Sequence, residues 1–293
     1  MRYLDPRNDL TFKKVFGEHP DLLISFLNAL MPFKDESEYI EKIEYLPTEL
    51  VPETPFRKDS IVDVRCVDVQ GRQFSVEMQM YWDDDFLQRV TFNASKAYVK
   101  QINKGKQFES LAPVYTLSLL NENFRSDGKS PAGIYYHHYS IVDVYDTNER
   151  IPGMEFVFIE LPKFKPKTMV EKKMSVLWLR YLTEIKDQTR DSEVALELKE
   201  NKYISKALDI LEESSYSDAE LDAYDRYWDA IMTYKTLMEN KVRKGIEEGL
   251  KEAIQQGAME ERLKNAKRMK AASIDLDTIC RVTGLTREEV ETI

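Results

Sequence analysis

Three polar residues, Asp63, Glu77 and Gln79, have the types and the spacing for chemistry on a divalent metal ion. Carboxylate oxygens are the hard ligands that Mg²⁺ and Mn²⁺ prefer. A cation held by them could polarise a phosphoryl oxygen and lower the pKa of a bound water, which are the two effects that phosphodiester hydrolysis needs. The same acids could also belong to an Asp–Arg–Glu network on a solvated sheet face, so these residues alone leave both interpretations open.

The stretch Ser60–Met80 must position these side chains, and its pattern predicts a β-hairpin. Apolar and polar residues alternate on both sides of Gly71, which is typical of strands with one buried face. Residues 68–71 read Asp-Val-Gln-Gly, a type I turn followed by a left-handed glycine, as in the three-residue hairpin loop. The turn and the alternation therefore predict the same register.

This register brings two acids together. The loop pairs Asp68 with Arg72, and counting back along both strands places Asp63 opposite Glu77. Two carboxylates at cross-strand distance repel each other, by roughly 1 kcal/mol in water and about 4 kcal/mol at an effective dielectric of about 20. Protonation of one carboxyl, neutralisation by Arg65, or a cation between the acids would relieve the repulsion, and we favour the cation.

The composition is that of a folded, acidic protein. The chain has 293 residues, 42% of them hydrophobic, with 16 tyrosines and 13 phenylalanines, enough for a large core. Its net charge is −10, so any nucleic-acid contact must come from a local basic patch. Cys66 and Cys280 have no CxxC spacing, which indicates a core residue and a helix residue in a reducing compartment. The N-terminus has no apolar leader and no apolar run is long enough to span a membrane, so we expect a soluble, cytoplasmic protein.

The first 165 residues predict an α/β fold. Residues 8–31 predict one helix, or two broken near Gly17, capped by Asn8 or Asp9 and ended by Pro32. Beyond the hairpin, further strands are expected at residues 113–120, 135–142 and 156–161. The order strand, strand, helix, strand predicts a sheet that a helix crosses over.

The expected helix after the hairpin begins at Asp83-Asp84-Asp85 and ends at Gly105. Gln101 falls on its apolar side, where it is either a core hydrogen-bonding group or a group directed at the site. The opposite, basic face is either solvated or follows a phosphate backbone. The apolar side comprises Leu87, Val90, Ala94, Ala97, Tyr98 and Ile102, and the basic stripe comprises Arg89, Asn93, Lys96, Lys100 and Lys104.

From about Thr168 the sequence predicts helices only. Within residues 241–268 the small residues Gly245, Gly249, Ala253 and Gly257 recur every four positions. Each glycine costs a helix about 1 kcal/mol relative to alanine. Their common face would admit a second helix, so self-association is one interpretation and a solvated, fraying helix is the other.

The tail predicts two short helices around Gly284, the second with a capping box formed by Thr286 and Glu289. The outline is that of a helix-turn-helix. However, its second helix carries three glutamates and, as its basic residue, Arg287. The resulting negative charge opposes binding in the major groove of DNA. A packing or partner-binding hairpin is therefore favoured over a DNA reader.

Other chemical motifs are excluded by their context. Gly128-Lys129-Ser130 copies the end of a P-loop but lacks the upstream glycine. His19, His137 and His138 are too few and too badly spaced for a zinc site. No serine or cysteine has the partners of a catalytic triad.

The chain contains the stretches NDLTFKKVFG, KDSIVDVRCVDVQGRQFSVEMQM, FLQRVTFNASKAYVKQINKG, VYTLSLL, IELPKF and ICRVTGLTREEVETI. Together they resemble the PD-(D/E)XK nuclease family transposases, also called recombination-promoting nucleases of the Rpn type. The resemblance implies a restriction-endonuclease-like core, a central mixed sheet flanked by helices, over residues 1–165. A helical region over 166–240 and a charged helix plus hairpin over 241–293 would follow. It also implies metal-dependent cleavage of DNA linked to recombination or transposition.

The resemblance also implies roles for single residues. Asp63 matches the family's metal-binding aspartate and Glu77 the glutamate of its E-x-K element, so both would hold Mg²⁺ or Mn²⁺. Gln79 stands where the wider superfamily has lysine; it could orient a water or a phosphate oxygen but supplies no charge. We hypothesise that Lys58 or Arg65 compensates.

Two further assignments are hypotheses. Asp9 is our candidate for an auxiliary acid, although it could simply cap a helix. Arg89, Lys96 and Lys100 would contact the DNA backbone. The expected partners are DNA and a second copy bound through the C-terminal helices. The main alternative is an inactive nuclease fold that binds DNA or protein, and a transcription factor using the C-terminal hairpin is a third interpretation.

Overall fold

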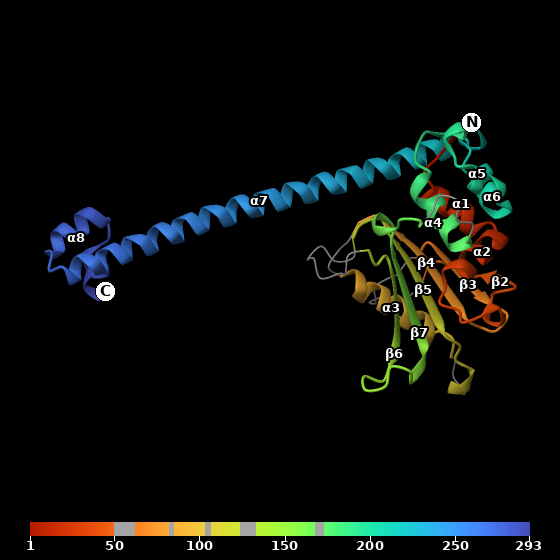
Figure 1. Ribbon diagram of the computed structural model, residues 1–293, viewed down its shortest axis with the longest axis horizontal. Coiled ribbons are helices and arrows are strands. Elements are labelled where there is room, and N and C mark those ends of the chain that lie inside the picture. Colours follow the sequence, from red (N-terminus) through yellow and green to blue (C-terminus); the bar gives the residue numbers. More distant parts are fainter. Residues whose placement is uncertain (50–61, 82–84, 103–106, 124–132, 168–172) are drawn as a thin grey trace. The chain divides into compact units, whose positions relative to one another are not determined.

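The computed structural model describes residues 1–49, 62–81, 85–102, 107–123, 133–167 and 173–293 (Figure 1). By its contacts the chain forms two compact units, Met1–Trp228 and Asp229–Ile293. The long helix α7, Asp218–Ala271, contributes residues to both. The division predicted at residues 165 and 240 stays a prediction.

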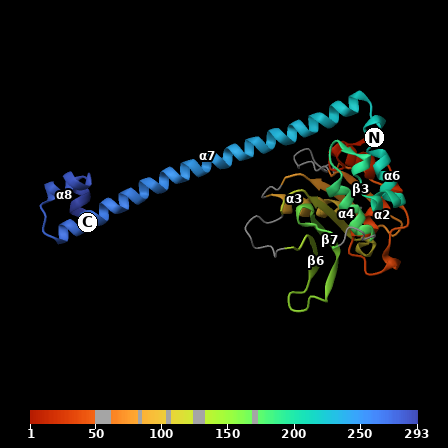
Figure 2. The same cartoon turned by 45° about the horizontal axis from the view of Figure 1, so that its top comes forward.

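The centre of the first unit is a mixed six-stranded sheet (Figure 2). A mixed sheet flanked by helices was predicted, but its edge strand β2 was not. Strands β4, β5 and β7 are parallel neighbours, and β2, β3 and β6 join antiparallel. The central strand β5 is buried along most of its length, as its apolar sequence predicts. In spatial order the strands are β2 (Ile43–Tyr45), β3 (Val64–Asp68), β4 (Gln73–Gln79), β5 (Val114–Leu120), β7 (Arg150–Glu160) and β6 (Tyr136–Val142).

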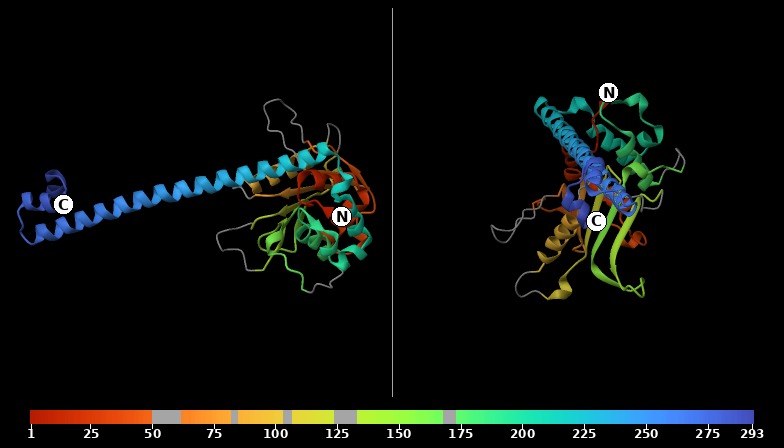
Figure 3. Two further views of the ribbon diagram at one scale, coloured as in Figure 1. Left: turned by 90° about the horizontal axis from the view of Figure 1, so that it is seen from above. Right: turned by 90° about the vertical axis from the view of Figure 1, so that its left-hand side faces the viewer.

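Helices cover both faces of this sheet (Figure 3). One face, with Val76, Leu117 and Val157, packs in a large core against helices from both ends of the unit. The other face, with Leu120 and Phe158, packs against α3. The helices of the unit are α1 (Asp9–Gly17), α2 (Pro20–Leu30), α3 (Phe86–Val99), α4 (Met174–Glu184), α5 (Leu196–Glu200), α6 (Lys202–Ile210) and the start of α7.

The N-terminal stretch forms two helices, which was one of the two predicted arrangements. Asn8 caps α1, because its side chain accepts from the backbone N–H of Leu10. The chain breaks after Gly17 and restarts at Pro20, which suits the first turn of α2. Asp9 is therefore the first helical residue and not the cap.

Short elements complete the unit. The expectation of helices only beyond Thr168 is wrong at one place, where β8 (Thr189–Arg190) pairs with β1 (Arg2–Tyr3). This pairing ties the N-terminus to the helical half of the unit. The 3₁₀ turns are η1 (Glu36–Glu38), η2 (Phe108–Ser110), η3 (Leu161–Lys163), η4 (Asp191–Glu193) and η5 (Glu213–Ser215).

Helix α3 is rotated relative to its predicted orientation. Leu87, expected inside, is 38% exposed, whereas Asn93, expected on the basic stripe, is buried. The reason is that the inner face centres on Phe86, Val90 and Asn93, which repeat at helical spacing over the sheet. Of the remaining positions, Lys104 and the predicted end at Gly105 lie outside the described residues, and so do Asp83 and Asp84.

Gln101 is a structural residue. Its amide nitrogen donates to the carbonyl of Ala112 and its amide oxygen accepts from the N–H of Ala112, both at 2.9 Å. Of the two predicted roles, the core hydrogen bond is the one observed.

The second unit has its own small core. It contains Ala266 of α7, Ile279 of α8 (Leu276–Thr283) and Val290 of α9 (Arg287–Thr292). Gly284 ends α8 with φ +72°, the left-handed conformation that glycine adopts without strain. The predicted capping box of Thr286 and Glu289 is confirmed.

Both cysteines are free, Cys66 buried in β3 and Cys280 in α8, as predicted. Within the described ranges, none of the helices combines the length and the apolar character needed to cross a membrane.

Candidate metal centre

The hairpin loop has the predicted conformation. The N–H of Gly71 donates to the carbonyl of Asp68, and the N–H of Asp68 donates to the carbonyl of Arg72, both at 3.0 Å. Gly71 has φ +81°, so the left-handed position falls on the residue that tolerates it. An ion pair of 2.6 Å between Arg72 Nε and Asp68 Oδ2 closes the loop.

The ladder above this loop confirms the predicted register. Val67 pairs with Gln73 and Val64 with Val76, so the next pair along the ladder is Asp63 with Glu77. The main-chain ladder ends at Val64, and the N–H of Met78 donates instead to Asp63 Oδ2 at 2.6 Å. The Asp63 carboxylate thus accepts a hydrogen bond from the main chain of β4, and this bond orients it beside Glu77.

Burial makes both carboxyls unusually weak acids. Desolvation raises the pKa of Asp63 to about 6; the charge of Asp9 adds to the rise, while the Met78 N–H and Lys13 oppose it. Desolvation raises the pKa of Glu77 to about 7, with the charge of Asp63 adding to it. Two such groups are costly to ionise together, and a divalent cation would relieve that cost.

The described part of the chain provides no ion pair for either acid. Arg65 does not neutralise them, because its guanidinium donates to the carbonyl of Pro47 at 2.8 Å and to Gln73 Oε1 at 3.2 Å. Gln73 lies at the loop end of β4, away from Glu77. The hypothesis that Arg65 compensates for the missing lysine is therefore wrong, and Lys58 lies outside the described residues. Protonation and a bound cation remain as ways to relieve the repulsion.

Helix α3 supports the polar face of β4. Asn93 Nδ2 donates to Glu77 Oε1 at 3.3 Å, and this amide opposes the rise in the pKa of Glu77. One turn earlier, Arg89 Nη2 donates to Gln79 Oε1 at 3.1 Å. The amide nitrogen of Gln79 donates to the carbonyl of Tyr81, so both polar atoms of this side chain are engaged.

Asp9 lies on the side of the site formed by α1. Its carboxylate pairs with Lys13 at 2.7 Å, and both side chains are about two-fifths exposed, at 41% and 42%. The negative charge of Asp9 contributes to the raised pKa of Asp63. Its predicted role as an auxiliary acid stays a prediction.

The sequence did not predict a place at this end of the sheet for two further residues, Arg7 and Tyr227. Arg7 Nη1 donates to Asn121 Oδ1 at 2.7 Å, and the N–H of Asn121 donates to the carbonyl of Gln79 at 2.9 Å. The pKa of Tyr227 is raised first by burial and then by the charges of Asp63 and Asp9. Neither position has a local sequence signal, because each depends on contacts between distant segments.

The donor set fits a hard cation with few protein ligands. Among the described residues, no group of three or more His, Cys, Asp or Glu side chains could hold a metal ion. Mg²⁺ is commonly held by one or two carboxylates with waters and phosphate oxygens filling the rest of its shell. Ser118, in register with Glu77 on β5, has a buried hydroxyl for which the described residues offer no hydrogen-bond partner. The pair Asp63 and Glu77 therefore fits Mg²⁺ or Mn²⁺ better than a protein-enclosed ion such as structural zinc.

The histidines belong to other interactions. His137 Nε2 lies 2.8 Å from Glu160 Oε2, and His138 Nε2 lies 2.6 Å from Glu155 Oε2. Lys163 also pairs with Glu160, at 2.8 Å.

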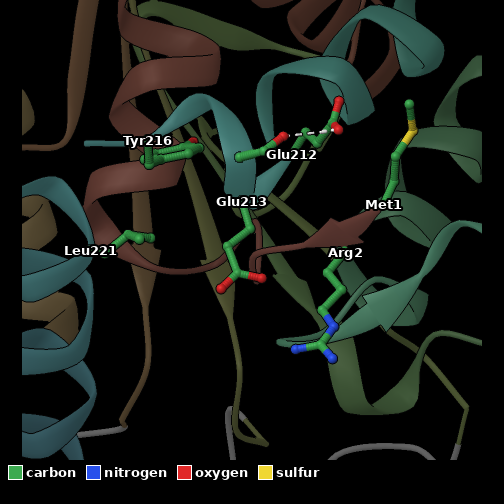
Figure 4. A pocket seen from close by; sticks show the side chains of 7 residues that line it. Met1, Arg2, Glu212, Glu213, Tyr216 and Leu221 are labelled. Carbon is green, nitrogen blue, oxygen red and sulfur yellow. Dashed lines mark hydrogen bonds between the residues drawn. The ribbon is translucent and has the colours of Figure 1, made fainter. Parts of the chain in front are cut away.

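The basic residues of α3 occupy different surroundings. Arg89 and Lys100 are exposed, and Lys96 lies over the ring of Phe92 at 5.1 Å. Their contact with a DNA backbone stays a prediction. The pocket in Figure 4 contains none of the predicted site residues: it is lined by Met1, Arg2, Glu212, Glu213, Ser214, Tyr216 and Leu221.

Comparison with known proteins gives one match. A family model described as PD-(D/E)XK nuclease family transposase matches residues 6–241, which include the whole hairpin, α3 and the start of α7. Neither the curated proteins nor the solved structures contain a match to the chain.

Proposed function

Because the chain belongs to the PD-(D/E)XK nuclease family transposases, we propose that it is a metal-dependent DNA endonuclease acting in recombination or transposition. One observation carries this proposal. Asp63 and Glu77 lie in register on one polar face, both with raised pKa values and without an ion-pair partner among the described residues. Such a pair is costly unless it binds a cation, and a cation there supplies the chemistry of phosphodiester hydrolysis.

Each side chain of the site has its own role in this proposal. Asp63 uses Oδ2 for the Met78 N–H and Glu77 uses Oε1 for Asn93, which leaves Oδ1 and Oε2 to hold Mg²⁺ or Mn²⁺. The bound ion would activate a water and polarise the phosphate. Lys96 and Lys100 on α3 would contact the DNA backbone. Asp9 would become a further ligand of the ion only if its ion pair with Lys13 broke.

Metal binding is the direct test of the site. By titration calorimetry at pH 8, we expect the wild type to bind Mn²⁺ and Glu77→Gln to bind it at least about tenfold more weakly, because a charged ligand is lost. Glu44→Gln, the same substitution at an exposed position of β2, should bind like the wild type. The same proteins are then assayed for Mg²⁺-dependent nicking of supercoiled plasmid DNA.

The alternative function gives a different result in the same experiments. An inactive nuclease fold that binds DNA or protein would ignore Mn²⁺ and would leave the plasmid intact. The neutral Gln79 at the lysine position favours this alternative, whereas the retained acid pair disfavours it. A wild type without Mn²⁺ binding at pH 8 would exclude the nuclease proposed above.

We also propose that α7 associates with a second copy of the chain. Val242, Ile246, Leu250 and Ile254 repeat every four residues and are 59–65% exposed. Around Gly245, Gly249 and Gly257 there is open space, which leaves room for a closely packed helix. Lysine and glutamate alternate nearby, so a second copy offers complementary charge as well as an apolar face.

Self-association is tested on the full chain by light scattering after gel filtration. We expect a dimer for the wild type and, for Leu250→Lys, a dissociation constant raised at least about tenfold, since a buried charge opposes packing. Gln255→Lys adds the same charge about 140° around the helix from Leu250 and should stay dimeric. A wild type that is monomeric at tens of micromolar would contradict the proposal.

A further inference from the structure

The first turns of helix α7 pack against helix α1 and run in the opposite direction. Lys14, in the last turn of α1, pairs with Glu220 of α7, with 2.7 Å between Nζ and Oε1. Asn8, the cap at the start of α1, donates from Nδ2 to the carbonyl of Tyr224 at 3.2 Å. Tyr227 follows three residues later, about 4.5 Å further along the helix axis. Helix α7 therefore reaches Tyr227 as it passes the start of α1.

The start of α1 is bonded to the strand that carries Glu77. Arg7 Nη1 donates to Asn121 Oδ1 at 2.7 Å, and the N–H of Asn121 donates to the carbonyl of Gln79 at 2.9 Å. Gln79 is the last residue of β4, two positions beyond Glu77. The residues at the start of α1 thus contact α7 on one side and the end of β4 on the other. This arrangement brings the turn of α7 that carries Tyr227 to the metal centre.

The acids of the metal centre act on the phenol of Tyr227. Burial raises its pKa first, and the negative charges of Asp63 and Asp9 raise it further. The Tyr227 ring also packs edge to face on the ring of Trp228, with 5.7 Å between the ring centroids. The ring is thus supported by its own helix, while its hydroxyl lies in the field of the two carboxylates and stays protonated at neutral pH.

Tyr224 and Tyr227, one helical turn apart, use their hydroxyls differently. The hydroxyl of Tyr224 accepts from the N–H of Asp5 at 2.9 Å and donates to Asp187 Oδ1 at 3.0 Å, so it joins three segments of the unit. Tyr227 is half-buried, and none of the residues that the structure describes forms a hydrogen bond with its hydroxyl. A phenol in such surroundings needs an acceptor. The two carboxylates would be engaged by the cation, so the natural acceptor is an anion that the cation holds.

We propose that the hydroxyl of Tyr227 donates a hydrogen bond to a non-bridging oxygen of the phosphate held at the metal centre, so that α7 contributes a substrate-binding residue to the site. The inference rests on the proposed nuclease function. In hydrolysis, a water oxygen forms a bond to phosphorus, the bond from phosphorus to the leaving sugar oxygen breaks, and a proton ends on that oxygen. Tyr227 keeps its own proton and stabilises the charge that builds on the phosphate.

The test removes this hydroxyl and keeps the ring. By titration calorimetry at pH 8, Tyr227→Phe should bind Mn²⁺ like the wild type, because the phenol is no ligand of the ion. Its dissociation constant for thymidine 5′-monophosphate, measured on the Mn²⁺-saturated protein, should rise about tenfold, since a hydrogen bond to a charged group is lost. The kcat for Mg²⁺-dependent plasmid nicking should fall about 10²-fold, the effect of removing one stabilising donor.

Two other tyrosines provide the controls. Tyr145→Phe is the same substitution at a side chain that is fully exposed in the loop between β6 and β7, and it should match the wild type in every measurement. Tyr224→Phe removes a hydroxyl with two hydrogen bonds and should lower the melting temperature by a few degrees. Tyr227→Phe should keep the melting temperature of the wild type, because its hydroxyl has no bond to lose among the described residues.

The outcomes separate this inference from a structural effect and from the function itself. Unchanged kcat and unchanged nucleotide affinity in Tyr227→Phe, with Asp63→Asn inactive, would overturn the role of Tyr227 and leave the nuclease proposal standing. A lower melting temperature with unchanged nucleotide affinity would assign the hydroxyl a structural role and would also overturn the inference. A wild type that binds no Mn²⁺ and nicks no DNA would overturn both proposals.

Discussion

Asp63→Asn is expected to lower the rate of Mg²⁺-dependent plasmid nicking by about 10³-fold or more. The substitution keeps the shape of the side chain, and the Asn oxygen can still accept from the N–H of Met78. It removes one of the two charges that would hold the ion. A metal-stabilised transition state is worth several kcal/mol, and each 1.4 kcal/mol is a factor of ten in rate.

The measurement compares purified wild type, Asp63→Asn and Asp222→Asn on the same plasmid. Asp222 is exposed at the start of α7, so its substitution tests the loss of one acid away from the site. The activity of the control should match the wild type and should vanish with a chelator. Equal rates for wild type and Asp63→Asn would remove Asp63 from the mechanism, and activity that survives the chelator would remove the metal.

The hairpin could be predicted from the sequence because its determinants are local. The alternation of apolar and polar residues and the Asp-Val-Gln-Gly turn lie within about twenty residues, and both predict the same register of the two strands. That register placed Asp63 beside Glu77 before any tertiary contact was considered. The same reasoning predicted the capping box of Thr286 and Glu289, whose bonds span three residues.

The predictions failed where tertiary packing decides between local alternatives. Asn93 was assigned to the basic stripe on its polarity, yet it is buried because the sheet presents the Glu77 carboxylate to it. Leu87 was assigned to the core on its apolar character, yet the inner face of α3 turns toward Phe86. For both residues, the helical period was right and the phase was set by β4 and β5.

The predicted start of strand β7 was also wrong, for a different reason. It begins at Arg150, six residues before the prediction, and includes Pro152 and Gly153, which argue against a strand. The irregular pairing between Ser140 and Ile141 of β6 lies beside these residues, and β5 first pairs at Met154. Pro152 therefore sits where a missing N–H costs little. Arg7 and Tyr227 could not be found at all, because their place at the site depends on contacts between segments that are far apart in the sequence.

Glu77→Gln is expected to stabilise the metal-free protein at pH 8. Burial raises the pKa of Glu77 to about 7 from its ordinary 4.5, so ionising this group costs folding free energy. The cost is absent below about pH 4.5, grows between pH 4.5 and 7, and is complete above pH 7. A shift of this size corresponds to about 3 kcal/mol as an upper limit. The amide avoids the charge and keeps an oxygen for Asn93.

Urea unfolding in the presence of a chelator measures this effect. At pH 8 we expect Glu77→Gln to have a free energy of unfolding about 1–3 kcal/mol above that of the wild type. At pH 5 most of the difference should be gone, because Glu77 is then protonated in the folded wild type. Glu44→Gln, at an exposed position, should follow the wild type at both pH values.

Metal should act against this difference in stability. Mn²⁺ at a hundred times its dissociation constant stabilises a binding protein by about 2.7 kcal/mol, and only the wild type keeps both carboxylates. Without metal the variant would be the more stable protein, but Mn²⁺ would stabilise it less than the wild type. Stability and metal binding would thus place opposite demands on this carboxylate. A carboxylate that merely belonged to a solvated Asp–Arg–Glu network would behave in the opposite way. Its removal would lower stability at pH 8, and added Mn²⁺ would change neither protein.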